Sequence, residues 1–586
     1  VLDECKPLLN GELMGLLDWC CDYYKHPPGE VFANAIPPVL RKAGGRLPLP
    51  EVQYRLTRSG QDRLAQPAGR AKQQFALLQL LAEGPIQAVQ LQEWHKGWRG
   101  FMSKLQEQGF ARSEEAGFTG LRPANGPELT SEQSAAVDAI SKSLGSFRCH
   151  LLDGITGSGK TEVYLELIRE VIENGQQVLV LVPEIGLTPQ LVRRFSERLG
   201  IQPAVYHSGL ADGQRLATWS AARNGQARLM LGTRSALFMP LSEPGLIIMD
   251  ESHDASFKQQ DGFRFSARDV AVKRASGIGI PIVLGSATPS LESIQNAHSG
   301  KYNWSRLRTR ATGATPPSLR VEDLRQRPLR GGLLEPVIET IGDTLGRGEQ
   351  ALVFLNRRGY APLLLCHECG WHGICQRCDA NLTWHRGARA LVCHHCDFRA
   401  GVPLVCPDCE ADALHGAGEG TQQLEQLLGK QFPDFPLHRF DRDQLSRKGA
   451  FADLYEQVRT GGPCMLVGTQ MLAKGHHFPL VTRVVIVNLD QALYSADFRA
   501  LERLGQLIVQ VSGRAGRAGH PGEVVLQTHH PDHPLLELLF EDGYEAFAME
   551  LLRDRAMAQL PPFSFQAVLR AEAGEREAVT EFLHDA

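Results

Sequence analysis

The sequence predicts an α/β protein with two parallel-sheet lobes, the second of which is interrupted by a cysteine-rich module. Apolar runs of strand length alternate with helical patterns in HLLDG, VLVLVP, LIIMDE and PIVLGSAT, and again in ALVFLN, CMLVGT, VVIVN and EVVLQT. Such alternation is typical of parallel sheets covered by helices on both faces. A complete phosphate-binding motif follows the first run, and eight of the 13 cysteines lie between Cys366 and Cys409. We expect a helical or winged-helix region before the first lobe and an α+β domain after the second.

The composition excludes several classes of protein. With 586 residues, 43% hydrophobic and 22% charged residues and a net charge of −4, the chain is no disordered tail, coiled coil or collagen. No apolar run reaches the roughly 18 residues that a membrane span needs. The opening VLDECKPLLN does not resemble a secretory signal. An odd cysteine total with most cysteines in C-x2-C pairs indicates a reducing, cytoplasmic compartment and metal sites.

The expected domains follow from changes along the chain in the pattern of apolar residues and in cysteine content. Residues 1–125 hold short helical runs and two short strands, which fit a DNA-binding region with a winged-helix module or, equally, a generic helical domain. The other expected segments are lobe 1 at 126–325, lobe 2 at 326–365 and 411–530, the cysteine-rich insertion at 366–410, and part of a C-terminal domain at 531–586.

The strongest motif is GITGSGKT at 154–161, a full match to G-x4-G-K-[ST]. A strand-like HLLD precedes it, and Val163, Tyr164 and Leu167 follow at helical spacing. In this setting backbone N–H groups and a helix N-terminus hold phosphate, with Lys160 on the β- and γ-phosphates and Thr161 on magnesium. The alternative is an ordinary glycine-rich turn. The expected ATP-binding loop is Gly154, Thr156, Gly157, Ser158, Gly159, Lys160 and Thr161.

Further charged residues complete the expected chemistry of ATP hydrolysis. LIIMDE ends an apolar run in Asp250, which can hold magnesium, and Glu251, which can polarise the attacking water. An acidic turn after a buried strand is the alternative. QVSGRAGR supplies Arg514 and Arg517 for the charge that develops on the γ-phosphate, although such a run is also common in solvated loops.

The order of the motifs resembles a known family. GITGSGKT, PEIGLTPQ, GTRSALF, DESH, GSATP, FLNRRGY, GTQMLAKGHHF and QVSGRAGRAG resemble, in order, the motifs of superfamily 2 helicases. An eight-cysteine insertion between FLNRRGY and GTQMLAKGHHF is similar to that of the replication-restart helicases, the primosomal protein N′ family. The resemblance implies two RecA-like lobes and ATP-fuelled 3′→5′ movement on DNA at stalled forks, leading to primosome assembly.

The resemblance also implies partners. They are forked and single-stranded DNA, single-strand-binding protein and other primosomal proteins that lead to the replicative helicase, with no membrane. We expect a cytoplasmic, nucleoid-associated monomer. The family also carries an N-terminal domain that captures the 3′ end of the leading strand and a longer C-terminal domain, and 3′-end recognition is not assigned to these residues.

The resemblance implies functional roles only for the residues of this sequence that stand at matching positions in the family's motifs. Lys160, Asp250, Glu251, Arg514 and Arg517 take the catalytic roles, and Thr161 with Asp250 holds magnesium. Gln133 resembles the adenine-reading glutamine, while Thr130-x-x-Gln133 also fits a capping box. Ser252 departs from the acidic or small residue that is usual in the family, so we expect tuning rather than loss.

The run SFKQQDGFRFSARD interleaves aromatic and basic residues after the hydrolytic pair. Rings stack on bases and cations follow phosphates in single-strand binding; the alternative is core packing, with Phe265 the most core-like ring. Residues 301–330, with net charge +6, are expected to add contacts or to form a solvated face. The expected DNA contacts are Phe257, Lys258, Phe263, Arg264 and, from phosphate-contacting loops of the family, Thr233, Arg234 and Thr469.

Four C-x2-C pairs predict two closed metal sites, because two pairs supply the four thiolates of a structural zinc. Three pairings are possible, and ligand type alone also permits an iron–sulfur cluster. The resemblance implies zinc and the nested pairing, with the neighbouring histidines as bystanders and a scaffolding role. The implied ligands are Cys366, Cys369, Cys406 and Cys409 for one zinc, and Cys375, Cys378, Cys393 and Cys396 for the other.

Two other functions fit parts of the pattern. The chain could be a primosome assembly scaffold in which ATP switches the conformation, or a superfamily 2 translocase that acts on RNA. A scaffold tolerates the loss of Asp250, Glu251, Arg514 and Arg517, and all four are present. The favoured hypothesis is therefore an ATP-dependent DNA helicase.

Overall fold

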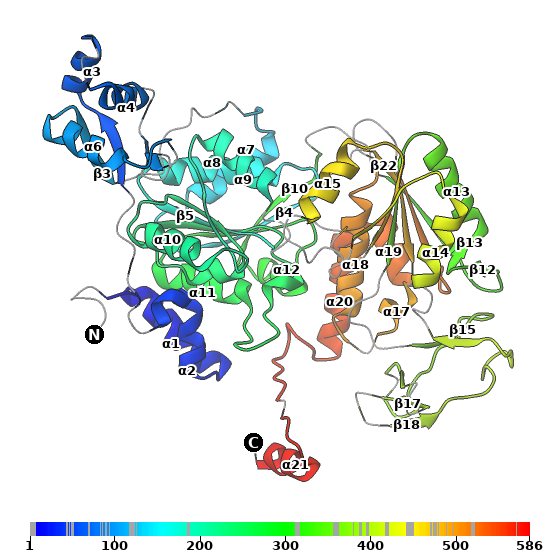
Figure 1. The fold of residues 1–586 in the computed structure, drawn as a ribbon. Coiled ribbons are helices and arrows are strands. Elements are labelled where there is room, and N and C mark those ends of the chain that lie inside the picture. The colour runs from blue at the N-terminus through cyan, green and yellow to red at the C-terminus, as the bar shows by residue number, and fades with distance from the viewer. Residues whose placement is uncertain are drawn as a thin grey trace. The chain divides into compact units, whose positions relative to one another are not determined.

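The computed structural model describes residues 7–585 except 43–44, 46, 48–51, 68–70, 83, 85, 88–90, 93, 116–123, 125, 184–187, 311–316, 356–362, 379, 386–388, 394–395, 397, 417–420, 441–449, 469–471, 473–477, 479, 488, 496, 517–521 and 570. The chain divides into two compact units (Figure 1). Unit 1 is Val1–Ser286 with Tyr302–Ala311, and unit 2 is Ala287–Lys301 with Thr312–Ala586.

Unit 1 is built on a seven-stranded parallel sheet, as the recurring apolar runs predict. Its strands, in spatial order, are β10 (Asn303–Leu307), β4 (Cys149–Gly154), β9 (Ile282–Ser286), β8 (Pro244–Met249), β5 (Gln177–Leu181), β7 (Leu229–Gly232) and β6 (Ala204–Tyr206). The central strands are buried along their whole length. Because all strands are parallel, the loops after β4, β7, β8 and β9 meet at one edge, where ligands bind in such sheets.

Helices cover both faces of this sheet, since right-handed crossovers in opposite directions place them on opposite sides. Figure 1 shows α8 and α9 on one face and α10 and α11 on the other. On the face of α8 and α9, apolar residues of these helices form a core with Val180 and Ile248 of the sheet. The helices of this lobe are α7 (Ser131–Ser141), α8 (Lys160–Glu173), α9 (Pro189–Leu199), α10 (Asp212–Arg223) and α11 (Ala267–Ile278).

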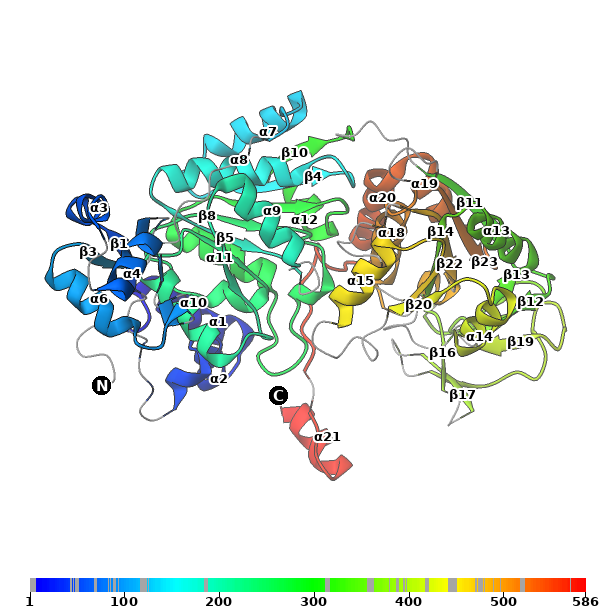
Figure 2. The same ribbon diagram turned by 45° about the horizontal axis from the view of Figure 1, so that its top comes forward.

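The N-terminal region contains two parts. Figure 2 shows the helices α3, α4 and α6 beside β1 and β3, two strands of a small antiparallel sheet, and this arrangement is compatible with the expected helical or winged-helix region. The first two helices of the chain instead contact the first lobe: Glu12 Oε1 pairs with the buried Arg274 at 3.0 Å, and Trp219 donates to Ala35 O. The elements are α1 (Gly11–Tyr24), α2 (Pro28–Ala35), β1 (Val52–Leu56), α3 (Arg58–Leu64), α4 (Lys72–Ala82), β2 (Ile86–Gln87), α6 (Trp98–Glu107) and β3 (Ala111–Glu115).

Unit 2 has a second parallel sheet of six strands. Their spatial order is β11 (Ser318–Asp323), β23 (Glu523–Thr528), β22 (Val481–Val487), β14 (Gln350–Leu355), β21 (Met465–Gly468) and β20 (Leu437–Phe440). Because β11 pairs with β23, the second lobe begins before the predicted boundary at residue 326. Its helices are α13 (Glu335–Gly346), α14 (Thr421–Gln431), α15 (Ala450–Thr460), α17 (Asp490–Leu493) and α18 (Ala500–Ser512).

The cysteine-rich insertion forms its own small fold within unit 2. Two short strands close its base and three antiparallel strands form its far end, around Leu382, Leu391 and two buried cysteines. The strands are β15 (Leu364–Cys366), β16 (Thr383–His385), β17 (Ala390–Val392), β18 (Arg399–Gly401) and β19 (Leu414–Gly416).

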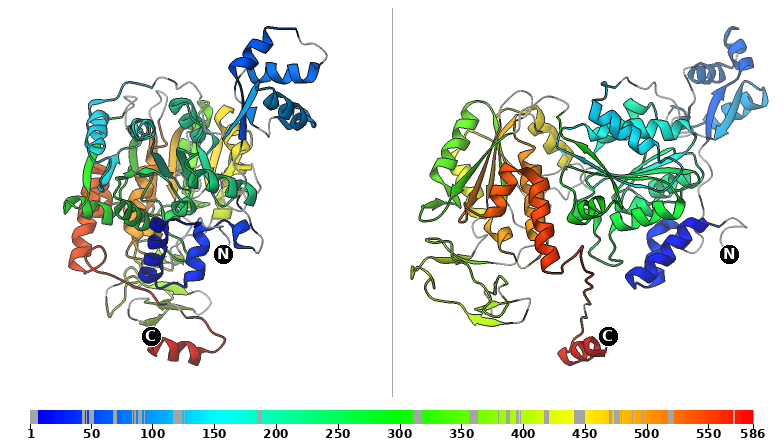
Figure 3. Two further views of the ribbon diagram at one scale, coloured as in Figure 1. Left: turned by 90° about the vertical axis from the view of Figure 1, so that its left-hand side faces the viewer. Right: turned by 180° about the vertical axis from the view of Figure 1, so that it is seen from behind.

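Beyond β23 the described residues form helices and irregular backbone with no strand, so the predicted α+β character of 531–586 is not seen among them. Figure 3 shows α20 (Gly543–Met557) beside α18, and Phe547 of α20 is buried. The other helices here are α19 (Pro534–Glu541) and α21 (Arg576–Asp585). Within the described residues, no helix combines the length and apolarity needed to cross a membrane.

Candidate functional site

The GITGSGKT loop connects β4 to α8 at the carboxyl edge of the first sheet. Gly157 and Gly159 have φ of +85° and +80°, the left-handed region that favours glycine. A Cβ on Gly154 would lie 2.6 Å from Ser158 Oγ, so this position also excludes a side chain. Lys160 Nζ donates to Gly154 O at 2.7 Å, which holds the amine over the loop. The buried Ser158 Oγ has no hydrogen-bond partner among the described residues, as expected of a loop shaped for an oxygen-rich ligand.

Gln133 is buried at the start of α7. It is predicted to read adenine or to form a capping box. Its Oε1 accepts from Thr130 N at 2.8 Å and its N–H donates to Thr130 Oγ1, so the capping box forms. Its Nε2 donates to Ser158 O at 2.8 Å, within the phosphate-binding loop. Gln133 therefore ties α7 to this loop, and a contact with adenine stays a prediction.

The two carboxylates follow β8, next to the loop. Burial, and then the charge of Glu251, raise the pKa of Asp250 to about 6, and the Lys160 charge opposes this shift. Glu251 has φ +47°, a strained conformation for a residue with a side chain. Such strain is found where function fixes the backbone. The same turn places His253 Nδ1 2.7 Å from Ser286 Oγ of the GSAT segment.

Ser252 suits its position. It is 4% exposed, and its N–H donates to Gly285 O at 2.9 Å, so that the DESH turn is bonded to β9. A small side chain fits this buried turn, which is consistent with the expectation of tuning rather than loss.

One residue at this edge was not singled out from the sequence. The Tyr164 hydroxyl donates to Asp250 Oδ1 at 2.9 Å, although Tyr164 counted only as an apolar position on the helix. Its one signal in the sequence is a polar tip on an otherwise apolar helix face, and that signal is weak because tyrosine is common in cores.

The aromatic-basic run after DESH requires a correction. Phe257, Phe263 and Phe265 are 3%, 2% and 1% exposed, so all three rings belong to the core. Phe263 stacks on Phe265 with centroids 4.7 Å apart, and Tyr24 of α1 meets Phe263 edge-on. Base stacking by Phe257 and Phe263 is therefore not supported by this arrangement, because packing the rings together outweighs exposing them.

The basic residues of the same run remain at the surface. Lys258 and Arg264 are exposed. Arg264 Nε donates to Gln260 O, and Lys258 Nζ lies over the Tyr24 ring. The predicted phosphate contacts of these two residues are compatible with their exposure.

The other predicted DNA contacts are placed unevenly. Thr233 is buried after β7, and Arg234 Nη1 donates to Ser256 O at 2.9 Å, which links its loop to the aromatic-basic run. Thr469 lies outside the described residues.

Several arginines of the +6 segment form ion pairs within the second unit. Arg320 pairs with Glu322 and Glu523, Arg325 with Asp323 at 2.7 Å, and Arg330 with Glu335 at 2.7 Å. These pairs support the second lobe. Glu322 and Asp323 belong to the segment and are already counted in its net charge, so of the carboxylates named here Glu523 and Glu335 are the ones that reduce it.

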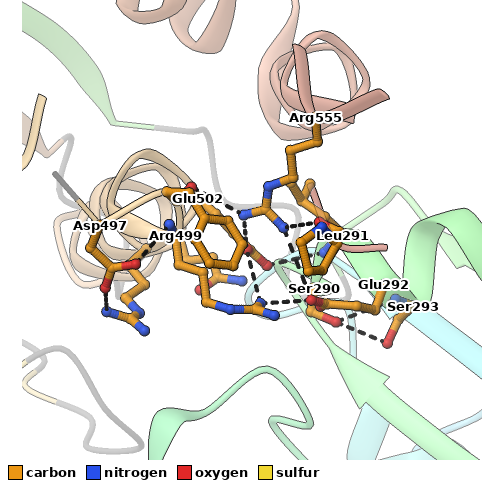
Figure 4. Close-up of polar contacts among 12 residues, drawn as sticks. Ser290, Leu291, Glu292, Ser293, Asp497, Arg499, Glu502 and Arg555 are labelled. Atoms are coloured by element: carbon orange, nitrogen blue, oxygen red, sulfur yellow. Dashed lines mark hydrogen bonds and ion pairs between the residues drawn. The ribbon is translucent and has the colours of Figure 1, made fainter. Parts of the chain in front are cut away.

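The arginine-bearing segment of unit 2 follows α18. Arg514 is buried just beyond this helix, and Arg517 lies outside the described residues. Figure 4 shows how α18 is joined to α12 (Leu291–His298) and α20. Glu502 Oε1 accepts from Leu291 N at 3.0 Å, and its other oxygen pairs with Arg555 at 2.7 Å.

Further contacts in this cluster hold the segment after GSAT. Arg499 pairs with Glu292 at 2.6 Å, Gln506 Nε2 donates to Thr288 O, and the Tyr544 hydroxyl donates to Pro289 O. Residues 287–301 are therefore held by the helix that leads to Arg514. Glu502 and Arg555 were not predicted, because their pairing depends on how separate helices pack.

The eight cysteines form two clusters of four with the nested pairing that the resemblance implied. The closest sulfur pairs are Cys366–Cys409 at 3.7 Å, Cys369–Cys406 at 3.6 Å, Cys375–Cys396 at 3.6 Å and Cys378–Cys393 at 3.5 Å. Zinc–sulfur bonds of about 2.3 Å give a tetrahedron with edges of about 3.8 Å. Both clusters therefore fit zinc, and all-cysteine closed sites are structural.

The insertion is bonded to the second lobe beside its outer cluster. His367 Nδ1 lies 3.0 Å from His529 Nε2, and His529 Nδ1 lies 2.8 Å from Asp490 Oδ2. Although burial opposes it, the hydrogen bonds from His529 and Thr528 lower the pKa of Asp490. His367, expected to be a bystander to the metal, thus has a structural partner.

Comparisons with known proteins agree with this geometry. Residues 130–297 match the family described as DEAD/DEAH box helicase, and residues 375–400 match the PriA DNA helicase Cys-rich region domain. Replication restart protein PriA of Haemophilus influenzae is 45% identical, over 97% of this chain and 79% of that protein. The Chlamydia pneumoniae protein of the same name is 37% identical over 96% and 78%.

Two further comparisons cover less of the matched proteins. Replication restart protein PriA of Bacillus subtilis is 41% identical, over 77% of this chain and 57% of that protein. Among solved structures, RecG bound to a three-way DNA junction has a TM-score of 0.46 at 19% identity, covering 74% of this chain and 48% of that chain.

Proposed function

Because this chain belongs to the PriA family of replication-restart proteins, we propose that it recognises and remodels stalled replication forks and initiates primosome assembly there. Its enzymatic class is that of an ATP-dependent DNA helicase. The proposal adds 3′→5′ movement on DNA, which the family resemblance implies.

The observation that carries the proposal is the convergence at one sheet edge of the glycine loop, Asp250 and the strained Glu251. We assign Lys160 to neutralising the β- and γ-phosphates, and Thr161 and Asp250 to holding magnesium. Glu251 orients the attacking water, and Arg514 and Arg517 stabilise charge on the γ-phosphate. Magnesium, when bound, supplies charge neutralisation to the phosphates.

The DNA contacts form a separate part of the proposal. Lys258 and Arg264 are exposed cations that can follow a phosphate backbone. Arg234 lies between its own loop and the aromatic-basic run, so we assign it to positioning as well as to phosphate contact. Thr233 and Thr469 keep their predicted phosphate contacts.

The zinc-binding insertion provides a rigid protrusion on the second lobe. Its two closed sites, each built from four cysteines, do no chemistry, so its use is to present surface to DNA or to a primosomal protein. We propose single-strand-binding protein and the primosomal proteins that lead to the replicative helicase as partners. The proposed location is the cytoplasm, at the nucleoid, and the proposed state is a monomer.

The test combines a variant with a substrate comparison. Lys160→Ala is expected to abolish DNA-stimulated ATP hydrolysis, while the wild type unwinds forked DNA and leaves an RNA duplex of the same sequence paired. Measuring hydrolysis and unwinding on forks with and without a nascent leading strand defines the preferred substrate. Near-normal turnover by Lys160→Ala would refute the loop assignment, and a preference for RNA would refute the substrate.

The scaffold alternative is distinguished by a second variant. A scaffold that only switches with ATP would support primosome assembly after Glu251→Gln, which binds ATP without hydrolysing it. The helicase proposal expects that variant to fail in fork unwinding and in any assembly that requires a cleared strand.

A further inference from the structure

The hydroxyl of Tyr164 lies at the junction of the three segments that form the nucleotide site. Tyr164 is four residues after Lys160 on α8, which places both side chains on one face of that helix. The ring is 1% exposed, and its hydroxyl donates to Asp250 Oδ1 at 2.9 Å.

The site is built around this hydroxyl. A Cβ added to Gly285, at the end of β9, would lie 1.6 Å from Tyr164 Oη and 3.4 Å from Asp250 Oδ1. The glycine of GSAT thus provides the space that the phenol occupies. Because Ser252 N also donates to Gly285 O at 2.9 Å, α8, the DESH turn and β9 meet at the hydrogen bond from Tyr164 to Asp250.

The hydrogen bond from Tyr164 can orient the carboxylate of Asp250, which is assigned to holding magnesium. A half-buried carboxylate beside Glu251 is stabilised by hydrogen-bond donors to its oxygens. The hydroxyl of Tyr164 satisfies one oxygen and fixes the rotation of the carboxylate about its Cβ–Cγ bond. The second oxygen then has a fixed direction in which to offer its lone pairs.

We propose that Tyr164 is a positioning residue for the magnesium-binding carboxylate of this site, acting through its hydrogen bond to Asp250 Oδ1. This inference rests on the proposed function and deepens it. Groups that hold metal ligands from behind typically contribute about 10- to 100-fold to metal affinity. Tyr164 does not touch the nucleotide itself, so its loss affects the magnesium requirement rather than the binding of the base or sugar.

The test is Tyr164→Phe, which removes one oxygen and keeps the ring. We expect the magnesium concentration that gives half-maximal ATP hydrolysis to rise about tenfold, while the rate at saturating magnesium is largely retained. A second readout is equilibrium binding of ADP: its tightening by magnesium is expected to fall by a similar factor, with affinity in EDTA unchanged.

Two further variants separate positioning from a structural role. Tyr206→Phe is a matched control, since Tyr206 is 2% exposed on β6 of the same sheet and contacts Arg215 through its ring. Gly285→Ala displaces the hydroxyl and is expected to raise the magnesium requirement as Tyr164→Phe does. In the double variant, the loss of the hydroxyl is expected to add little to the effect of Gly285→Ala.

The outcomes are distinct. An unchanged magnesium requirement and unchanged ADP binding in Tyr164→Phe overturn the inference, even where the melting temperature falls. If Lys160→Ala loses activity as expected and Tyr164→Phe behaves as wild type, only this inference fails. If Lys160→Ala retains activity, the proposed function fails first.

Discussion

The carboxyl edge of the first sheet and the aromatic-basic run after it are neighbours in the chain, but they differ in backbone strain and in how their side chains are packed. At the edge, Ser158 Oγ is buried with no hydrogen-bond partner in the described part of the chain, and Glu251 has a strained backbone. In the run, Asp254 accepts from Ser256 N, Ser266 caps α11, and the rings stack on one another. Folding leaves the first region ready for a ligand, whereas in the second it packs the rings within the protein, although Ser256 Oγ there is also buried with no hydrogen-bond partner among the described residues.

This difference indicates that the sheet edge is the region where a ligand binds or a reaction takes place. Unmet hydrogen bonds and strain cost stability, and they persist where a ligand or a reaction compensates. Rings that pack on one another contribute to stability, and the exposed cations Lys258 and Arg264 are groups of this run that can bind DNA.

The largest effect is expected from Glu251→Gln at the sheet edge. Loss of a group that orients the attacking water is expected to slow ATP hydrolysis by about 10²- to 10⁴-fold, with ATP binding retained. Single-turnover hydrolysis and equilibrium nucleotide binding check this. A slow variant that also fails to bind ATP would mean that Glu251 supports the fold rather than the reaction.

Phe263→Ala tests the aromatic-basic run. Truncating a core ring is expected to destabilise the first lobe by about 3–5 kcal/mol, because Phe263 packs against Phe265 and Tyr24. Chemical denaturation measures the loss. If stability is unchanged while the affinity for single-stranded DNA falls, Phe263 binds bases and is not a core residue.

Glu502→Ala tests the buried ion pair between α18 and α20 in the second unit. Removing one member of a buried ion pair is expected to cost about 3–5 kcal/mol, since Arg555 is 4% exposed and loses its nearest carboxylate. Thermal unfolding of Glu502→Ala and Arg555→Met checks this. The double variant is expected to be less destabilised than the sum of the single variants; additive losses would mean that the two residues act separately.

The smallest effect is expected from the exposed charges of the aromatic-basic run. Lys258→Ala and Arg264→Ala are each expected to weaken DNA binding modestly and to reduce the salt slope of affinity by about one. Binding titrations at several salt concentrations measure it. Arg330→Ala is the control, since Arg330 is paired with Glu335. An equal loss in the control would assign the effect to net charge alone.

The parts that the sequence predicts well are those in which spacing dictates backbone geometry. The glycines at 157 and 159 occupy left-handed positions, and the C-x2-C pairs place their sulfurs at zinc-site distances. The parallel sheets follow from continuous apolar runs, whose residues are buried on both faces.

The parts that it misses depend on contacts between distant segments. Phe263 is in the core because α1 brings Tyr24 to it. The charge of Arg320 is neutralised by Glu523, which reaches it through strand pairing. Tyr164 gains its role only because β8 and β9 end beside it. A pattern of residue types in one segment does not determine such encounters.

The assignment of residues 287–301 to the second unit has a topological consequence. The chain passes between the two units three times, at 286/287, 301/302 and 311/312. A single cut at the last crossing would leave α12 on the N-terminal fragment, still capped by Glu502 of the C-terminal one. The two fragments would then share a helix as complementing halves do, so that severing the polypeptide would not by itself separate them.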